Sequence, residues 1–252
     1  MLSRLSLITP VIFAACLFPL AALAEDAPLP KLGPDAVPLT ADSAYLRSAA
    51  APDYWALAPF VRPQFTTSAC SIASVTAVTN GLAGLPALAE DTILSQPGLL
   101  ELTGRADWAE LSAEGGDGVT FDQLVEFTQA ALDARALPQT ITTFHPETDD
   151  EATLAALRAL LAANEASADD MAMVYFNQGV VTGDWDGPHV TPIGAYDAAG
   201  DRVLLLEVDQ EWYIPYWTPV PVLLASMLRP APADQGVLEG QTGGLVIVGA
   251  DG

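Results

Sequence analysis

Cys70 is the residue of this sequence best placed to act as a nucleophile. It opens a predicted helix that runs to a stop signal at Asn80 and Gly81, because apolar residues recur at helical spacing through this segment. A thiol in the first turn of a helix feels the positive end of the helix dipole and unpaired backbone N–H groups, which favour the thiolate. The alternative is that Cys70 is a small core residue, as most free cysteines are.

A histidine and two carboxylates follow Cys70 in an order that suits thiol chemistry. His189 stands where a Gly- and Asp-rich loop meets a predicted strand, a junction that can hold a general base rigidly in a cleft. Glu207 and Asp209 stand at the end of the next predicted strand and share one of its faces. Either carboxylate could orient the His189 ring toward the thiol, as in covalent catalysis. The alternative is a structural histidine and a charged strand end. His145 has no comparable neighbours and is predicted at the surface.

The composition restricts the class of protein. The chain has 252 residues, 51% of them hydrophobic, with 9 basic and 32 acidic side chains and a net charge of −23. The hydrophobic fraction excludes a disordered chain, and two cysteines are too few for a disulfide scaffold or a four-cysteine zinc site. Because contacts to phosphates need Lys or Arg, the acidic balance argues against nucleic acid as a partner. We expect a soluble, acidic, globular protein.

Residues 1–24 have the pattern of a secretory signal peptide. An apolar run from Leu5 to Leu20 follows a single positive charge, and Ala22-Leu23-Ala24 forms a small-x-small cleavage site. Prolines within the run, and the polar stretch after it, argue against a membrane anchor. We therefore predict a periplasmic or secreted protein with no membrane span after cleavage. A lipoprotein signal at Cys16 is the alternative.

Removal of this segment would leave one cysteine in the chain. Cys70 would then be an unpaired thiol in a compartment where cysteines normally form disulfides. Such a thiol is either buried and inert or kept free because it reacts.

The pattern of the remaining chain predicts an α+β fold. Residues 25–40 are rich in proline and are expected to form an extended, poorly ordered lead-in to a single domain over 41–252. A capping box at Thr120 to Gln123 opens a helix to about Ala136, and Asp149-Asp150 can cap another that ends near Asn164. Helices in the first half and strands in the second are typical of α+β proteins. The predicted strands are Met171–Phe176, Val190–Tyr196, Val203–Val208 and Leu245–Val248.

Three blocks of sequence resemble the phytochelatin synthase family of papain-like enzymes. The segment from Gln64 to Leu82 is similar to the family's nucleophile region, in which a glutamine stands six residues before a helix-opening cysteine. Residues 176–179 and 189–196 resemble its HFSPIGxY block. Residues 203–208 and 213–219 resemble its DVxRxKYPPxWVP block. The blocks have the order and spacing of the family's catalytic domain and cover roughly residues 50–230.

The resemblance implies a fold and a set of roles. The fold would be papain-like, with a helical N-terminal half that carries the nucleophile helix packed on a mainly antiparallel sheet. By position, Cys70 matches the nucleophile, His189 the base and Gln64 the side-chain donor of the oxyanion hole. Alignment without a gap places Glu207 where the family has an aspartate, with Asp209 as the substitute.

The sequence also departs from the family's pattern. Ser71 replaces the glycine after the cysteine. Gln210 and Trp212 replace basic residues that in the family help to bind the γ-glutamylcysteine part of glutathione. These losses bear on the substrate rather than on the reacting groups.

The implied function is a cysteine-dependent acyltransferase or hydrolase acting on glutathione. Cys70 would attack the Cys–Gly carbonyl, glycine would leave, and the γ-glutamylcysteinyl thioester would pass its acyl group to a second glutathione or to water. No tightly bound cofactor and no metal ligands are implied. A heavy metal such as cadmium would enter as a complex with glutathione thiolates.

Two other functions stay open at this point. A papain-like peptidase of the leader-processing type has the same order of residues, and the lost basic contacts favour it. A non-catalytic periplasmic thiol or metal-binding protein is the second alternative, although one cysteine and two histidines are few ligands for a soft metal.

Overall fold

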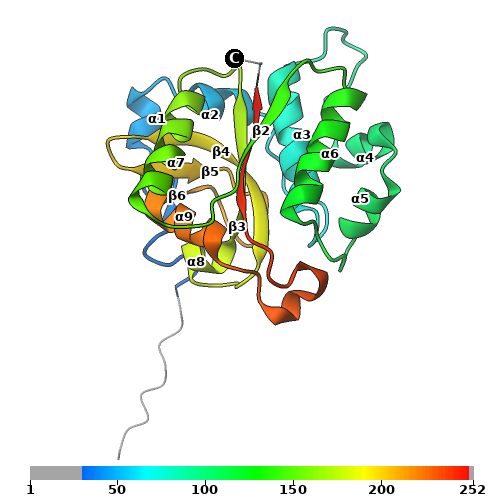
Figure 1. The fold of residues 1–252 in the computed structure, drawn as a ribbon. Coiled ribbons are helices and arrows are strands. Elements are labelled where there is room, and N and C mark those ends of the chain that lie inside the picture. Colours follow the sequence, from blue (N-terminus) through cyan, green and yellow to red (C-terminus); the bar gives the residue numbers. More distant parts are fainter. Residues whose placement is uncertain (1–29, 250–252) are drawn as a thin grey trace, which may run out of the picture.

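A seven-stranded sheet forms the middle of the molecule (Figure 1). The computed structural model describes residues 30–249, so the predicted signal peptide, its cleavage site at Ala24 and Cys16 lie outside the described residues. The strand order is β1-β6-β5-β4-β3-β7-β2, and every neighbouring pair is antiparallel. The strands are β1 (Val37–Pro38), β2 (Thr140–Phe144), β3 (Met171–Asn177), β4 (Pro188–Asp197), β5 (Arg202–Leu205), β6 (Tyr216–Pro219) and β7 (Gly244–Gly249).

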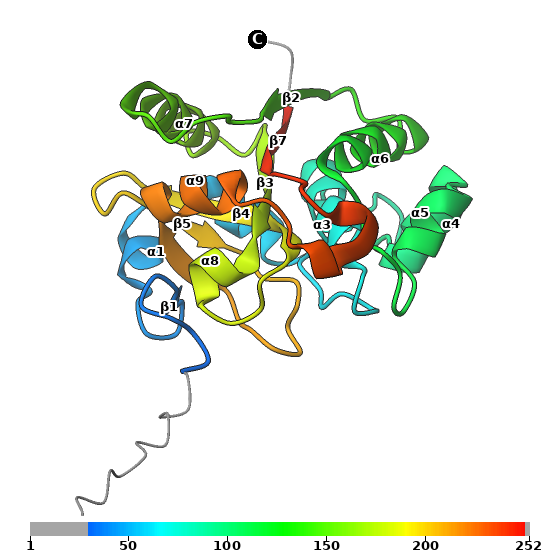
Figure 2. The same cartoon turned by 60° about the horizontal axis from the view of Figure 1, so that its bottom comes forward.

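Helices cover both faces of this sheet (Figures 1 and 2). Helices α3 to α6 lie on one side of β3, and α7 to α9 lie on the other. None of the helices within residues 30–249 has the length and apolar character needed to cross a membrane. The helices are α1 (Ala44–Ser48), α2 (Pro52–Leu57), α3 (Cys70–Ala83), α4 (Gln96–Thr103), α5 (Ala106–Leu111), α6 (Phe121–Ala134), α7 (Glu151–Asn164), α8 (Gln178–Thr182) and α9 (Val220–Leu228), with a 3₁₀ segment η1 (Ala233–Leu238).

The central strands are buried on both faces because two apolar cores meet at them. Along β3, Met171, Met173 and Tyr175 pack toward α3 and α6. Val174 and Phe176 alternate with them and pack toward α7 and α9. This period of two is what a strand between two helical layers requires.

The predicted fold class and the predicted helices are confirmed, but the predicted stop at Asn80 and Gly81 is wrong: α3 continues to Ala83 and ends where Gly84 has a positive φ of 69°. The structure is α+β, and the helix that begins at Cys70 lies against the antiparallel sheet. The capping box forms as expected, with Thr120 and Gln123 each bonded to the backbone of the other. Asp150 caps α7 through the backbone N–H of Thr153. Helices and strands are less separated along the chain than predicted, since α8 and α9 lie in the second half.

The strands differ from the prediction at their ends and in number. Strand β5 ends at Leu205 rather than at Val208, because the chain then leaves the β5–β6 pairing and the Leu206 N–H donates to the carbonyl of Pro192 in β4. Strands β1, β2 and β6 were not predicted. The edge strand β2 is threonine-rich and mostly exposed, so its extended form depends on pairing with β7 rather than on an apolar pattern of its own.

The N-terminal lead-in is more ordered than predicted over residues 30–40. The Gly33 N–H donates to the Thr182 carbonyl at 2.6 Å, Ala36 is buried, and Val37 and Pro38 pair with β6. Proline is compatible with this edge position because an edge strand leaves N–H groups without ladder partners. The expectation of a poorly ordered segment is therefore wrong for these residues, which pack against the body of the protein.

Asp53, in the first turn of α2, is a buried carboxyl group, and neither of its oxygens has a hydrogen-bond partner. Burial, with the nearby carboxylates of Asp170 and Glu165, raises the pKa of Asp53 to about 9. The folded protein therefore keeps a proton that the unfolded chain loses above pH 4. Stability from this group is complete below pH 4 and is lost as the pH rises toward 9.

The variant Asp53→Asn tests this assignment. Because asparagine does not ionise, the free energy of unfolding of the variant relative to the parent should rise between pH 5 and pH 8, by up to about 4 kcal/mol. Urea denaturation at the two pH values measures the change. The exposed Asp149→Asn is the control. A difference between Asp53→Asn and the parent that does not depend on pH would contradict the assignment.

Candidate active site

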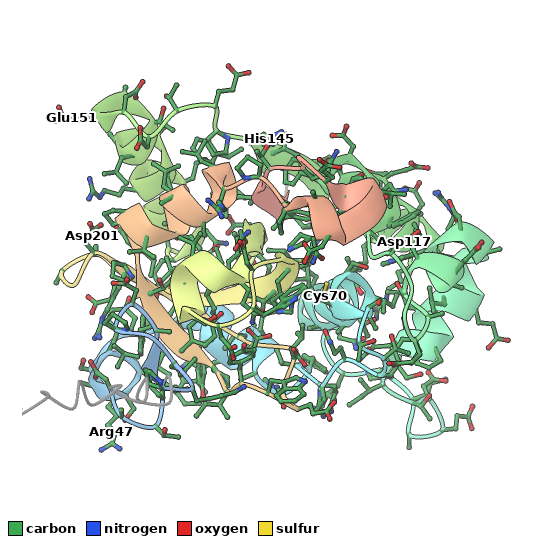
Figure 3. The ribbon with its side chains drawn as sticks, turned by 90° about the horizontal axis from the view of Figure 1, so that it is seen from below. Arg47, Cys70, Asp117, His145, Glu151 and Asp201 are labelled. Carbon is green, nitrogen blue, oxygen red and sulfur yellow. The ribbon has the colours of Figure 1, made fainter. Side chains whose placement is uncertain are left out.

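Cys70 is the first residue of α3, a helix that is buried along most of its length. The small residues of this helix allow it to approach the sheet closely. Ser74, one turn after Cys70, donates its hydroxyl to the Val190 carbonyl of β4 at 3.0 Å. The indole of Trp108 donates to the Ser71 hydroxyl at 3.0 Å, so the serine that follows the cysteine also fixes the helix. These two bonds place the half-buried, free thiol of Cys70 beside the start of β4, near the middle of the molecule (Figure 3).

His189 lies near the start of β4 and links Cys70 to Glu207. Its Nε2 atom is 2.6 Å from Glu207 Oε1, and the ring is also hydrogen bonded to the side chain of Cys70. Since Nε2 faces the carboxylate, Nδ1 is the nitrogen that faces the thiol. The ring of Phe176, across the β3–β4 pair, packs edge-on against His189 at 5.8 Å between centroids. Hydrogen bonds from both ring nitrogens and the packing of Phe176 therefore fix the orientation of the imidazole.

Glu207 is fully buried and is bonded by three further donors. The amide of Gln178 donates to Oε2 at 3.0 Å, and the Tyr216 hydroxyl donates to the same oxygen at 3.3 Å. The backbone N–H of Asp209 donates to Oε1 at 2.7 Å. A buried carboxylate needs such partners to stay ionised. The donors also fix the oxygen that faces His189.

The charges of His189 and Glu207 stabilise one another. Burial alone raises the pKa of Glu207, but the charge of His189 and the hydrogen bonds to the carboxylate hold it below its usual value. Burial alone lowers the pKa of His189, but the Glu207 carboxylate and the Cys70 side chain raise it well above its usual value. These contacts with Glu207 and Cys70 favour the protonated form of the His189 ring over the neutral form.

Asp209 lies next to this group but does not bond the His189 ring. Its side chain lines the cavity in front of Cys70, and burial raises its pKa. Of the two carboxylates proposed from the sequence, Glu207 is the one in hydrogen-bonding contact with the histidine.

Gln64 also lines the cavity that contains Cys70. Its backbone N–H donates to the Val208 carbonyl at 2.8 Å, which ties the residue to the segment that carries Glu207. Its side-chain Nε2 donates to the Thr67 carbonyl at 3.3 Å, whereas its buried Oε1 has no partner. The long bond at Nε2 leaves this donor available to a bound molecule.

The cavity in front of Cys70 has a volume of about 450 Å³. Trp185 and Trp212 stand in its wall and are partly exposed. Tyr175 is buried in its floor, and its hydroxyl has no hydrogen-bond partner. Three aspartates and one lysine also line the cavity: Asp117, Asp184, Asp209 and Lys31.

Several residues of this site were not identified from the sequence. Gln178 and Tyr216 lie inside the blocks that resemble the family, but only the folded chain shows that both donate to Glu207. Lys31 lies in the segment that was expected to be poorly ordered. The prediction for His145 is confirmed, since it is exposed and bonds Thr242 away from the cavity.

No group of three or more histidine, cysteine or acidic side chains suited to a metal ion occurs in the part of the chain that the structure describes. The donor set at Cys70 is one thiol and one imidazole, and the imidazole is already bonded to Glu207.

The family to which the chain belongs follows from a comparison with protein families. A search among curated proteins finds no match to the chain. The model of the phytochelatin synthase family matches residues 34–236, well over half of the chain. The matched range contains Gln64, Cys70 and His189, which line one cavity, and the buried Glu207, which is hydrogen bonded to His189. The chain belongs to the phytochelatin synthase family, a family of transferases.

Proposed function

We propose that the protein is a cysteine-dependent acyltransferase and hydrolase that acts on glutathione. The family supports a role in γ-glutamylcysteinyl transfer in general. The observation that carries the specific proposal is the His189 ring, bonded by Glu207 on one side and by the Cys70 thiol on the other, at the wall of a cavity large enough for a tripeptide.

In the first step, the Cys70 thiolate attacks the carbonyl carbon of the Cys–Gly bond. Gln64 Nε2 and the backbone N–H groups at the start of α3 are the donors for the oxyanion. The His189 imidazolium gives its proton to the glycine nitrogen, the carbon–nitrogen bond breaks, and glycine leaves. A γ-glutamylcysteinyl thioester remains on Cys70.

In the second step, His189 is the base. It takes a proton from water or from the amine of a second glutathione as that molecule attacks the thioester. The carbon–sulfur bond breaks and the Cys70 thiolate returns. Water gives γ-glutamylcysteine, and glutathione gives a chain longer by one γ-glutamylcysteine unit. Glu207 holds the ring in one orientation throughout and stabilises its charged form.

A heavy metal enters this scheme as part of the substrate. A soft cation such as cadmium binds thiolates, so glutathione itself supplies its ligands. We also propose that the protein works after export, on the basis of the signal-like pattern in residues 1–24.

The assignment of Gln64 leads to a separate prediction. Gln64→Ala is expected to lower kcat for glycine release about 10²- to 10³-fold with little change in KM, since one oxyanion donor acts mainly in the transition state. Steady-state kinetics measure both constants. Thr67→Ser, which keeps the carbonyl that Gln64 bonds, is the control. A rise in KM at constant kcat would instead make Gln64 a substrate-binding residue.

Product analysis tests the function as a whole. The protein is incubated with glutathione, with and without cadmium, and the products are identified by mass spectrometry. Free glycine together with γ-glutamylcysteine or a lengthened chain is the expected result. If glutathione stays intact under both conditions while a peptide with small residues is cleaved, the protein is a peptidase of the leader-processing type.

A further inference from the structure

The N-terminal segment brings one cation to the wall of the cavity. Lys31 is the only lysine of the chain, and among the described residues that line this cavity it is the only Lys or Arg. Its Nζ lies 3.4 Å from Asp184 Oδ2, and the side chains of both residues are about half exposed. A protein with 32 acidic and 9 basic residues has thus placed its single lysine in the wall of the cavity that contains its candidate nucleophile.

Aromatic rings and the backbone hold Lys31 in this position. Its ammonium group lies 4.7 Å from the centre of the Trp212 ring and 4.5 Å from that of Tyr213, and both are cation–π contacts. Two residues later, the Gly33 N–H is bonded to Thr182, the last residue of α8. A Cβ atom on residue 33 would lie 2.8 Å from the Thr182 carbonyl oxygen, so glycine is needed for this approach.

The Lys31 ammonium group has N–H donors that its present partner does not use. A lysine offers three N–H donors, and Asp184 accepts one of them across a long distance. Asp184 is itself bonded by the Tyr213 hydroxyl at 2.9 Å. Lys31 can therefore bind a carboxylate of a bound molecule without losing its present partner.

The charges around Lys31 select the kind of carboxylate. Asp184 and Asp209, which also line the cavity, both interact electrostatically with Lys31. An isolated carboxylate would be repelled by these two groups, whereas a carboxylate with an ammonium group on the same carbon would be complementary to all three. A γ-linked glutamyl group has this zwitterionic end. The glycine end of glutathione carries a carboxylate alone.

We propose that Lys31 is a specificity-determining residue that binds the α-carboxylate of the γ-glutamyl group, with Asp184 and Asp209 facing the adjacent ammonium. This inference rests on the proposed action on glutathione. It makes the N-terminal segment part of the substrate site, and it favours γ-linked peptides over ordinary peptides, whose amino-acid residues lack a free α-carboxylate beside an α-ammonium.

The test combines two substitutions at Lys31 with two altered substrates. One substrate is γ-aminobutyryl-Cys-Gly, which lacks only the α-carboxylate in question, and the other is glutathione esterified at glycine. With glutathione, Lys31→Met is expected to raise KM about 10- to 100-fold, the usual range for loss of a charge-assisted bond, with kcat changed little. Lys31→Arg should restore most of the loss. The control Arg47→Met removes an equal charge at an exposed site far from Cys70 (Figure 3) and should leave KM unchanged.

The pattern across substrates decides the proposal. Lys31→Met should impair the glycine ester as strongly as glutathione, but should have no effect on γ-aminobutyryl-Cys-Gly, on which the parent is already weak. The proposal would be overturned if Lys31→Met raised KM equally for all three substrates. It would also be overturned if Lys31→Met raised KM for glutathione but not for the glycine ester.

A binding measurement separates this proposal from the proposed function. Calorimetric titration of glutathione and of γ-aminobutyryl-Cys-Gly into Cys70→Ala, with and without Lys31→Met, needs no turnover. If the parent releases no glycine but glutathione binding still depends on Lys31 and on the α-carboxylate, the proposed reaction is wrong and the proposed binding site is supported. Equal affinity for both ligands would reject the binding site.

Discussion

The substitution Cys70→Ala is expected to abolish release of glycine from glutathione. Without the thiolate there is no group in the cavity to form the thioester, and water alone reacts with a peptide bond very slowly. The loss should reach about 10⁵-fold or more, the order found when a nucleophile of this kind is removed. Glycine release measured by mass spectrometry over hours gives the residual rate.

Folding has to be separated from chemistry in this experiment. Cys70 makes few packing contacts that alanine would lose, because its side chain is small and half-buried. The thermal unfolding midpoint of Cys70→Ala should therefore stay close to that of the parent. Ser71→Ala is the matched control, since it removes the acceptor of the Trp108 indole beside the nucleophile but leaves the thiol. It should lower stability and retain most of the activity. Substantial glycine release by Cys70→Ala would exclude thioester chemistry.

The second large effect is expected for Glu207→Gln. The amide keeps the shape of the side chain but removes the charge that favours the His189 imidazolium, and its NH₂ group competes with the donors Gln178 and Tyr216. Loss of the orienting carboxylate costs about 10⁴-fold in kcat in the comparable serine enzymes. We expect a loss of about 10²- to 10⁴-fold here. Steady-state rates of glycine release measure it.

The pH profile distinguishes orientation and charge from a general loss of structure. The Glu207 carboxylate raises the pKa of His189, so the imidazolium persists to higher pH than a free imidazole would. Without that charge, the fall of activity on the alkaline side should move to lower pH in Glu207→Gln. Asp209→Asn is the control for kcat, because Asp209 lines the cavity without bonding the ring. Its kcat should fall by less than about fivefold, as for a partly exposed charge, whereas its proposed contact with the substrate ammonium group should raise KM. The opposite ranking of the two variants would make Asp209 the orienting carboxylate.

Local sequence signals predicted the helices whose formation depends on residues within the same segment. The helix from Cys70, the capping box at Thr120 and the Asp150 cap all formed, because helical spacing and side-chain caps act within a few residues. The strand β2 and the ordered segment from Gly33 to Pro38 were missed for the opposite reason. Their conformation depends on distant partners in β7, β6 and α8, which no local pattern encodes.

The site shows the same division. Cys70, His189, Gln64 and the pair Glu207 and Asp209 were found from residue type, position and resemblance. The choice between the two carboxylates needed the geometry, because β5 ends before Glu207 and the two side chains do not extend from one regular strand.

Lys31 is the clearest case of a residue that the sequence could not place. The resemblance marked Trp212 as a position where the family's basic residue is absent. In the folded chain, the Trp212 ring packs against a lysine from a segment 181 positions earlier. Only the long-range pairing of the N-terminal segment with β6 and α8 brings these residues together.

Intact-protein mass spectrometry of the enzyme during turnover tests the central claim most directly. The protein is mixed with glutathione, quenched in acid and weighed, with Cys70→Ala treated in parallel. The account predicts that the parent gains an adduct with the mass of glutathione minus glycine. This adduct should map to Cys70 and should resist a reductant, and Cys70→Ala should carry no adduct. Only a whole-glutathione adduct that a reductant removes, or the acyl adduct on Cys70→Ala, would contradict thioester catalysis by Cys70.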